Sequence, residues 1–210
     1  MSRTIDYYFT LVSPWAYLGH NAFTDVVKRH GAAVRYKPVA LGAVFPASGG
    51  LPLAKRHPLR VKYRDVELQR WREKRGLTFH LKPAFWPFDP TFIDCVTVAL
   101  ATRGDDVEAF VPRAFAGIFA DQRDLTDPGV IADMLAAAGL DAPAIMKAAV
   151  DPQTKATYEA NTHGALDAEV FGSPAYVLEG EVFWGQDRLD MLDDALRTGR
   201  APYRPAPPRA

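Results

Sequence analysis

A serine followed by a proline identifies the first segment of this sequence whose residues could take part in chemistry. Ser13 and Pro14 stand between a short aromatic run and a stretch with helical spacing. Proline suits the first position of a helix, because its φ is already helical and it has no N–H to leave unpaired. Ser13 is then expected at the N-cap, at the positive end of the helix dipole. Such a position can hold a thiolate or another anion, although an ordinary capping serine fits the same pattern.

A second proline precedes a strand-like run near the C-terminus. Ser173 and Pro174 follow Gly172 and lead into an apolar segment. A cis bond before Pro174 would leave the backbone of Ser173 free to pair with an extended peptide. A trans-proline that simply begins a strand fits these residues as well.

A third segment, Trp-Gly-Gln-Asp-Arg at 184–188, follows the next strand-like run. Gly185 ends that strand, and Gln186 and Asp187 open the last helix. Asp187 can cap its helix. Alternatively, its carboxylate and nearby N–H groups can bind both charges of a small zwitterion. The combination of the three segments is far more specific than any one of them.

Hydrophobic spacing predicts the elements that position these residues. The expected strands are 4–10, 34–39, 175–178 and 182–184, and the expected helices are 14–30, 58–75, 92–102, 107–121, 128–138, a short one after 141, 152–168 and 187–196. The first strand, helix and strand form a βαβ unit with parallel strands. Segment 41–52 is rich in Gly, Ala and Pro and is predicted to be a loop, and Gly180 is predicted at the tip of a hairpin.

The sequence therefore predicts an α/β fold in which a four-stranded sheet (βαβ…ββα) is interrupted by a large all-helical insertion. We expect a discontinuous domain of residues 1–50 plus 169–202, an inserted helical domain of residues 51–168, and a loose tail at 203–210.

Composition excludes several classes of function. The 210 residues have a formal net charge of zero, so no broad cationic surface points to nucleic acid or to anionic lipid. No long apolar span predicts a membrane helix. The single cysteine, Cys95, permits no internal disulfide, which suits a reducing cytoplasm. The five histidines have no spacing that predicts a metal site.

The three segments together resemble those of the 2-hydroxychromene-2-carboxylate isomerases. These are kappa-class glutathione transferases of the thioredoxin-like, DsbA-related superfamily. The resemblance extends over nearly the whole chain and includes Leu-Gln-Arg-Trp at 68–71 of the long helix. It implies a thioredoxin-like fold, glutathione as the cofactor, a small aromatic hydroxy acid as the substrate, a homodimer and a cytoplasmic location.

The resemblance also implies roles for the residues of the glutathione site. Ser13 matches the serine that hydrogen-bonds the glutathione sulfur and favours its thiolate. Ser173, before a cis Pro174, matches the residue whose backbone pairs with the glutathione cysteine. Gln186 and Asp187 match the positions that hold the γ-glutamyl end. Trp184 and Gly185 match positions that line the approach to this site.

The substrate side departs from the family pattern. Some members carry a lysine shortly after the second strand and an Asn-Arg pair about ten residues later. Here the corresponding segments are 43–46 and 53–58, which lack that lysine and that asparagine. Lys55 or Arg56 is the expected replacement for binding a carboxylate, although a solvated basic helix start fits equally. The expected substrate-site residues are Phe45, Ala54, Lys55, Arg56 and Phe85.

The resemblance implies isomerisation of 2-hydroxychromene-2-carboxylate to trans-o-hydroxybenzylidenepyruvate in naphthalene-type catabolism, with glutathione regenerated. A general kappa-type glutathione transferase or peroxidase would use the same glutathione site. A glutathione-binding protein without turnover is also compatible with these residues. A thiol–disulfide oxidoreductase is disfavoured, because that exchange needs a sulfur where Ser13 stands.

Overall fold

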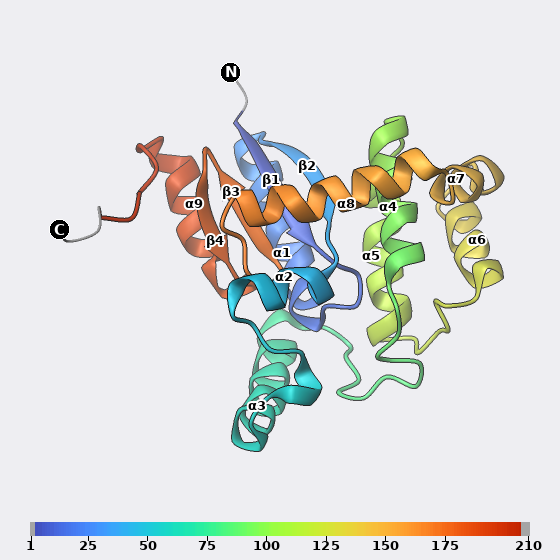
Figure 1. Ribbon diagram of the computed structural model, residues 1–210, viewed down its shortest axis with the longest axis horizontal. Coiled ribbons are helices and arrows are strands. Elements are labelled where there is room, and N and C mark those ends of the chain that lie inside the picture. The colour runs from blue at the N-terminus through green and yellow to red at the C-terminus, as the bar shows by residue number, and fades with distance from the viewer. Residues whose placement is uncertain (1–2, 207–210) are drawn as a thin grey trace.

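Four strands form a mixed sheet in the order β2-β1-β3-β4 (Figure 1). The strands are β1 (Thr4–Phe9), β2 (Ala33–Pro38), β3 (Ala175–Leu178) and β4 (Glu181–Trp184). Strand β1 is parallel to β2 and antiparallel to β3, and β3 pairs antiparallel with β4. The structure is a computed structural model that describes residues 3–206. The predicted α/β sheet of thioredoxin type is confirmed.

Helices cover both faces of the sheet. They are α1 (Pro14–His30), α2 (Leu41–Ser48), α3 (Pro58–Arg75), α4 (Thr91–Arg103), α5 (Val107–Phe119), α6 (Pro128–Ala137), α7 (Ala142–Ala149), α8 (Pro152–Asp167) and α9 (Leu189–Thr198). The Tyr7 ring contacts Phe23 of α1 at a centroid distance of 4.6 Å, whereas Tyr8 donates a hydrogen bond to the carbonyl of Gly164 in α8. Successive strand residues point to opposite faces. Helices α1 and α8 therefore lie on opposite faces, with α8 crossing in front of the sheet in Figure 1.

The inserted helices share a hydrophobic core with the sheet. Helices α4 to α7 gather beyond one edge of the sheet in Figure 1. Phe115 of α5 nevertheless lies 6.1 Å from the ring of Phe9 in β1, and Phe119 stacks on Tyr17 of α1 at 5.3 Å. One buried apolar cluster runs through all four of these residues. The division into a discontinuous domain and an inserted domain remains a prediction.

Segment 41–52 corrects one prediction from the sequence. The structure contains helix α2 where a loop was expected, and the short 3₁₀ helix Leu53–Lys55 follows that segment. Pro46 lies inside α2, and its missing N–H removes one backbone hydrogen bond. Val44 of this helix is completely buried. Burial of its apolar side chain favours the helix and opposes the low helix propensity of the nearby Gly and Pro residues.

The predicted loose tail is held where it begins. Arg200 forms two hydrogen bonds to the Glu181 carboxylate, and the Tyr203 N–H donates a third at 2.9 Å. Arg204 donates to the carbonyl of Glu179 at 2.7 Å. Residues 207–210 of the predicted tail lie outside the described residues. Within residues 3–206, no helix has both the length and the apolar character needed to cross a bilayer.

Candidate active site

The first two motifs meet at the N-terminus of α1. Ser13 caps this helix and accepts a hydrogen bond from the Ala16 N–H at 3.3 Å. Its hydroxyl donates to the carbonyl of Ser173 at 3.2 Å, and the Ser173 hydroxyl accepts from the Thr10 N–H at 3.2 Å. The peptide bond between Ser173 and Pro174 is cis, which is the isomer that the family resemblance implies and that the residues alone left open. Two segments 160 residues apart therefore form one hydrogen-bonded unit.

The Ser13 hydroxyl has the environment expected of a hydrogen-bond donor to an anion. The residue is only 5% exposed, so water competes weakly for its proton. The bond that it accepts from Ala16 polarises the hydroxyl, and the first turn of α1 adds the positive end of the helix dipole. An incoming thiolate would compete with the Ser173 carbonyl for the Ser13 proton and would accept a charge-assisted bond.

The third motif lies against the same helix. The Gly185 N–H donates to the Pro174 carbonyl at 2.9 Å, which connects it to the cis-proline turn. Gly19 of α1 passes so close to Gln186 that a Cβ at position 19 would lie 2.4 Å from the Gln186 Cβ. The structure thus brings all three predicted segments together around the start of α1.

Gln186 is buried, and Arg75 holds it in place. Gln186 is 2% exposed, and its side-chain oxygen accepts from Arg75 Nη2 at 2.9 Å. Arg75 Nη2 also donates to the Gln186 backbone carbonyl at 3.2 Å. This leaves the amide NH₂ of Gln186 as its free donor group. Asp187 is exposed, and its carboxylate pairs with Arg188 at 2.6 Å.

A small hollow beside Gln186 carries charges of both signs. It has a volume of about 40 Å³ and is lined by Trp71, Lys74, Arg75, Gln186, Asp187 and Asp190. Cationic and anionic side chains around one hollow suit a zwitterionic group. Sequence reasoning missed Arg75, because nothing local indicates that a residue at the end of α3 contacts one that is 111 positions later.

A buried carboxyl group supports the loop before Ser13. Asp94 of α4 accepts hydrogen bonds from the Thr10 hydroxyl at 2.7 Å, the Leu11 N–H at 2.9 Å and the Tyr158 hydroxyl at 3.3 Å. It is completely buried, and burial raises its pKa to about 7, although these three bonds act in the opposite direction. Sequence reasoning missed Asp94. The available signal was a single acidic residue inside an apolar helix, which is rare without a partner.

Four of the predicted substrate-site residues lie in the segment that precedes α3, and the fifth, Phe85, lies in the loop between α3 and α4. Phe45 is half-buried, and the Arg56 guanidinium lies 5.8 Å from its ring centroid. Ala54 and Lys55 are exposed in the short 3₁₀ helix. Phe85 is 47% exposed.

Trp86, next to Phe85, contacts the loop before Ser13. Its Nε1–H donates to the Val12 carbonyl at 2.9 Å. The Trp86 ring is therefore in direct contact with the residue that precedes Ser13.

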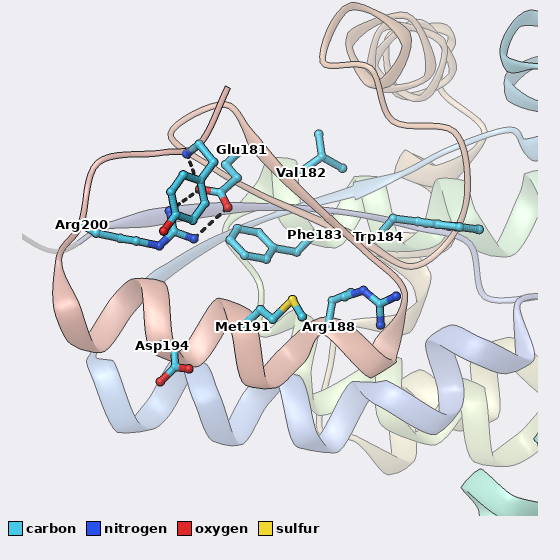
Figure 2. Close-up of a pocket in the computed structure, with 9 residues that line it drawn as sticks. Glu181, Val182, Phe183, Trp184, Arg188, Met191, Asp194 and Arg200 are labelled. Atoms are coloured by element: carbon cyan, nitrogen blue, oxygen red, sulfur yellow. Dashed lines mark hydrogen bonds and ion pairs between the residues drawn. The ribbon is translucent and has the colours of Figure 1, made fainter. Parts of the chain in front are cut away.

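A larger cavity, of about 490 Å³, lies away from this unit at the outer edge of the sheet (Figure 2). It is lined by Glu181, Val182, Phe183, Trp184, Arg188, Met191, Asp194, Arg200 and Tyr203. Trp184 is the predicted site residue that reaches it, and this ring also contacts Phe171 at 4.6 Å. Ser13 and Ser173 do not line the cavity, so it does not include the pair of serines at the start of α1. Among the residues that the structure describes, no group of three His, Cys, Asp or Glu side chains could hold a metal ion.

Comparisons with known proteins agree with this geometry. The family model of the DsbA-like thioredoxin domain matches residues 4–197. A 2-hydroxychromene-2-carboxylate isomerase of Sphingobium xenophagum is 30% identical over 93% of this chain and 99% of its own length. A solved 2-hydroxychromene-2-carboxylate isomerase superposes with a TM-score of 0.81 at 25% identity, covering 93% of this chain and 95% of that chain.

A further relative is glutathione S-transferase kappa 1 of Caenorhabditis elegans, which is 24% identical over 92% of this chain and 90% of its own length. The sheet, the cis-proline turn and the matches over nearly the whole chain lead to one assignment. The chain belongs to the 2-hydroxychromene-2-carboxylate isomerases, a family of isomerases with the DsbA-like thioredoxin fold.

Proposed function

We propose that this protein is a glutathione-dependent isomerase that converts 2-hydroxychromene-2-carboxylate to trans-o-hydroxybenzylidenepyruvate in aromatic catabolism. The observation that carries the proposal is the Ser13 hydroxyl, which donates to the Ser173 carbonyl at the N-terminus of α1. A serine in this place can bind a sulfur anion but cannot exchange disulfides. The names of the isomerase and kappa-transferase relatives support the same reaction and cofactor.

The residues present fit glutathione. The tripeptide carries a thiol in its middle and a zwitterionic γ-glutamyl end. Ser13 and the Ser173 backbone would hold the cysteine portion, and the mixed-charge hollow beside Gln186 and Asp187 would hold the γ-glutamyl end. The Gln186 side-chain oxygen already accepts a hydrogen bond from Arg75, so the Gln186 NH₂ would donate to the γ-glutamyl carboxylate.

When bound, glutathione supplies a thiolate that can add reversibly to a conjugated alkene and so permit rotation about that bond. The chain supplies the environment. Ser13 donates to the sulfur and, with the helix dipole, lowers the pKa of the thiol. The low exposure of Ser13 and Ser173 keeps water from competing for this bond. Trp184 is exposed beside the turn and would line the entry for the cofactor.

The variant Ser13→Ala tests this role. A hydrogen bond to a charged group contributes about 1.5–3 kcal/mol, so its loss should slow turnover at neutral pH by roughly 10- to 100-fold. The measurement is the absorbance change of 2-hydroxychromene-2-carboxylate with and without glutathione. Ultraviolet titration of the bound thiolate should show its pKa raised in the variant.

Ser48→Ala is the matched control, because it is the same substitution at an exposed serine on α2. It should leave both the rate and the thiolate titration unchanged. If Ser13→Ala turned over at the wild-type rate with an unaltered thiol pKa, Ser13 would have no part in activating glutathione.

A kappa-type glutathione transferase is the second candidate, favoured by the relative from Caenorhabditis elegans. It would use the same cofactor site and release a stable thioether. Incubation with glutathione and a model electrophile distinguishes the two, because an isomerase returns glutathione unchanged. Dimerisation and a cytoplasmic location remain predictions from the family resemblance.

A further inference from the structure

Helix α3 carries a cation without a well-placed partner near the candidate active site. The side chain of Arg64 is only 12% exposed. Its acidic neighbour within residues 3–206 is the adjacent Asp65, whose Oδ1 lies 3.5 Å from Nη1. That distance is too long for a strong charge-assisted bond, and a guanidinium has five donor positions to satisfy. Burying a cation with so little compensation is costly unless an anion approaches it.

Arg64 lies next to the loop that carries Ser13. Its guanidinium lies over the Trp86 ring, 5.7 Å from the centroid. The Nε1–H of the same ring donates to the carbonyl of Val12 at 2.9 Å. Trp86 therefore contacts Arg64 on one side and the residue before Ser13 on the other. Figure 1 shows α3 at the end of the molecule where β1 passes into α1.

A second arginine reinforces the positive charge in this region. Arg56 lies 5.8 Å from the Phe45 ring centroid, and its Nε–H donates to the Leu51 carbonyl at 2.7 Å. Burial lowers the pKa of Arg64, Asp65 opposes this effect, and the charge of Arg56 adds to it. Two arginines within electrostatic range of each other, both over aromatic rings, form a surface with positive charge and apolar walls.

We propose that Arg64, assisted by Arg56, is the carboxylate-binding residue of this active site, with Trp86 and Phe45 as the flat walls beside it. The proposal rests on the proposed function and names the cation that the departure from the family pattern left open. The planar fork of a guanidinium matches a carboxylate with two parallel hydrogen bonds. Lys55, the other predicted cation, is exposed and therefore less able to form a desolvated pair.

Two carboxylates could occupy this site, that of the chromene substrate and the glycyl carboxylate of glutathione. Binding measurements distinguish them without any need for turnover. The probes are coumarin-3-carboxylate, an unreactive planar bicyclic acid, its neutral carboxamide, and glutathione. Each is titrated by calorimetry into the wild-type protein, into Arg64→Met, and into the control Arg70→Met, which removes an exposed charge from the same helix.

For a substrate site, Arg64→Met should weaken binding of the coumarin acid about tenfold or more and leave the carboxamide and glutathione unchanged. For a glycyl site, glutathione binding should weaken instead. Arg64→Lys keeps the charge without the fork and should give an intermediate loss, and it serves if the methionine variant fails to fold. Arg70→Met should change none of the three.

The proposal is overturned if Arg64→Met changes neither acid by more than about twofold, or if the coumarin acid and its carboxamide weaken equally. Failure of the proposed function gives a different result. In that case the wild-type protein would not isomerise the chromene acid with glutathione, yet the difference between Arg64→Met and wild type in binding the carboxylate would persist.

Discussion

Asp94 should make the stability of the folded protein depend on pH in an unusual direction. Its carboxyl group is completely buried, and burial raises its pKa from 3.8 to about 7. Between those pH values the unfolded chain has lost the proton, whereas the folded chain retains it. The folded state then binds more protons, so its stability falls as pH rises towards 7 and levels off above that value. Most paired carboxylates produce the opposite trend.

The size of the effect follows from the two pKa values. A difference of about 3 between 3.8 and about 7, at about 1.4 kcal/mol for each pH unit, gives about 4 kcal/mol. Asp94→Asn removes this titration, while its oxygen and NH₂ can still pair with Leu11, Thr10 and Tyr158. The stability of the wild-type protein relative to Asp94→Asn should therefore fall by up to about 4 kcal/mol between pH 4 and pH 8.

Equilibrium urea unfolding, followed by tryptophan fluorescence at intervals over this range, measures the difference. Asp124→Asn is the control. Hydrogen bonds from the Thr126 hydroxyl and N–H lower the pKa of Asp124 in the folded protein, so it remains ionised there. Above about pH 5, where this carboxyl group is ionised in the unfolded chain as well, the curve of Asp124→Asn should run parallel to that of the wild-type protein. Parallel curves for Asp94→Asn and wild type would refute the reasoning, because they would mean that Asp94 stays charged in the folded state.

Two further changes test the residues that support the proposed glutathione site. Gly19→Ala should cost about 1–3 kcal/mol in urea unfolding and weaken glutathione binding, because its Cβ would lie 2.4 Å from the Gln186 Cβ. Gly164→Ala is its control, since its nearest neighbour is the Tyr8 hydroxyl at 3.7 Å, and it should be neutral or slightly stabilising. Arg75→Met should release the Gln186 side chain and weaken glutathione binding about tenfold by calorimetry. Unchanged affinity in Arg75→Met would mean that the orientation of Gln186 does not matter for the cofactor.

Local signals in the sequence were sufficient to predict the helix and the hairpin that carry the motifs. The N-cap at Ser13, the proline that follows it and the left-handed Gly31 that ends α1 are properties of neighbouring residues. The hairpin was predicted with Gly180 at its tip. The structure narrows its turn to Glu179 and Gly180, both with positive φ, which is the geometry that suits two-residue hairpins.

Contacts between distant segments could not be predicted in the same way. Asp94 appears in the sequence only as a polar residue in an apolar helix, and its partners Thr10 and Leu11 lie more than eighty positions earlier. The pairing of Arg75 with Gln186 depends on how the end of α3 packs against the 3₁₀ turn Gln186–Arg188, which precedes α9. Helix α2 was missed because burial of Val44 outweighs a local composition that favours a loop.

The hydrogen bonds around Ser13 also suggest why a buried carboxyl group belongs beside this site. The Ser13 hydroxyl bonds to Ser173, the Ser173 hydroxyl bonds to Thr10, and the Thr10 hydroxyl bonds to Asp94. An ionised Asp94 accepts every bond that reaches it, whereas a protonated Asp94 has one O–H that can donate to the Thr10 or the Tyr158 hydroxyl. Donation to Thr10 would reorient the Thr10 hydroxyl and so couple the proton of Asp94 to the loop that carries Ser13.

The pH dependence of the activity near neutral pH should then reflect the titration of two groups, the thiol of the proposed glutathione cofactor and the carboxyl group of Asp94. Ser13→Ala should raise the pKa of the thiol and leave the titration of Asp94 in place. Asp94→Asn should remove the second limb of the pH–rate profile and retain the first, because Ser13 remains in place to donate to the proposed thiolate. Because Ser13 and Asp94 belong to one hydrogen-bond network through Ser173 and Thr10, their effects should be coupled, and the double variant should differ from the sum of the two single variants.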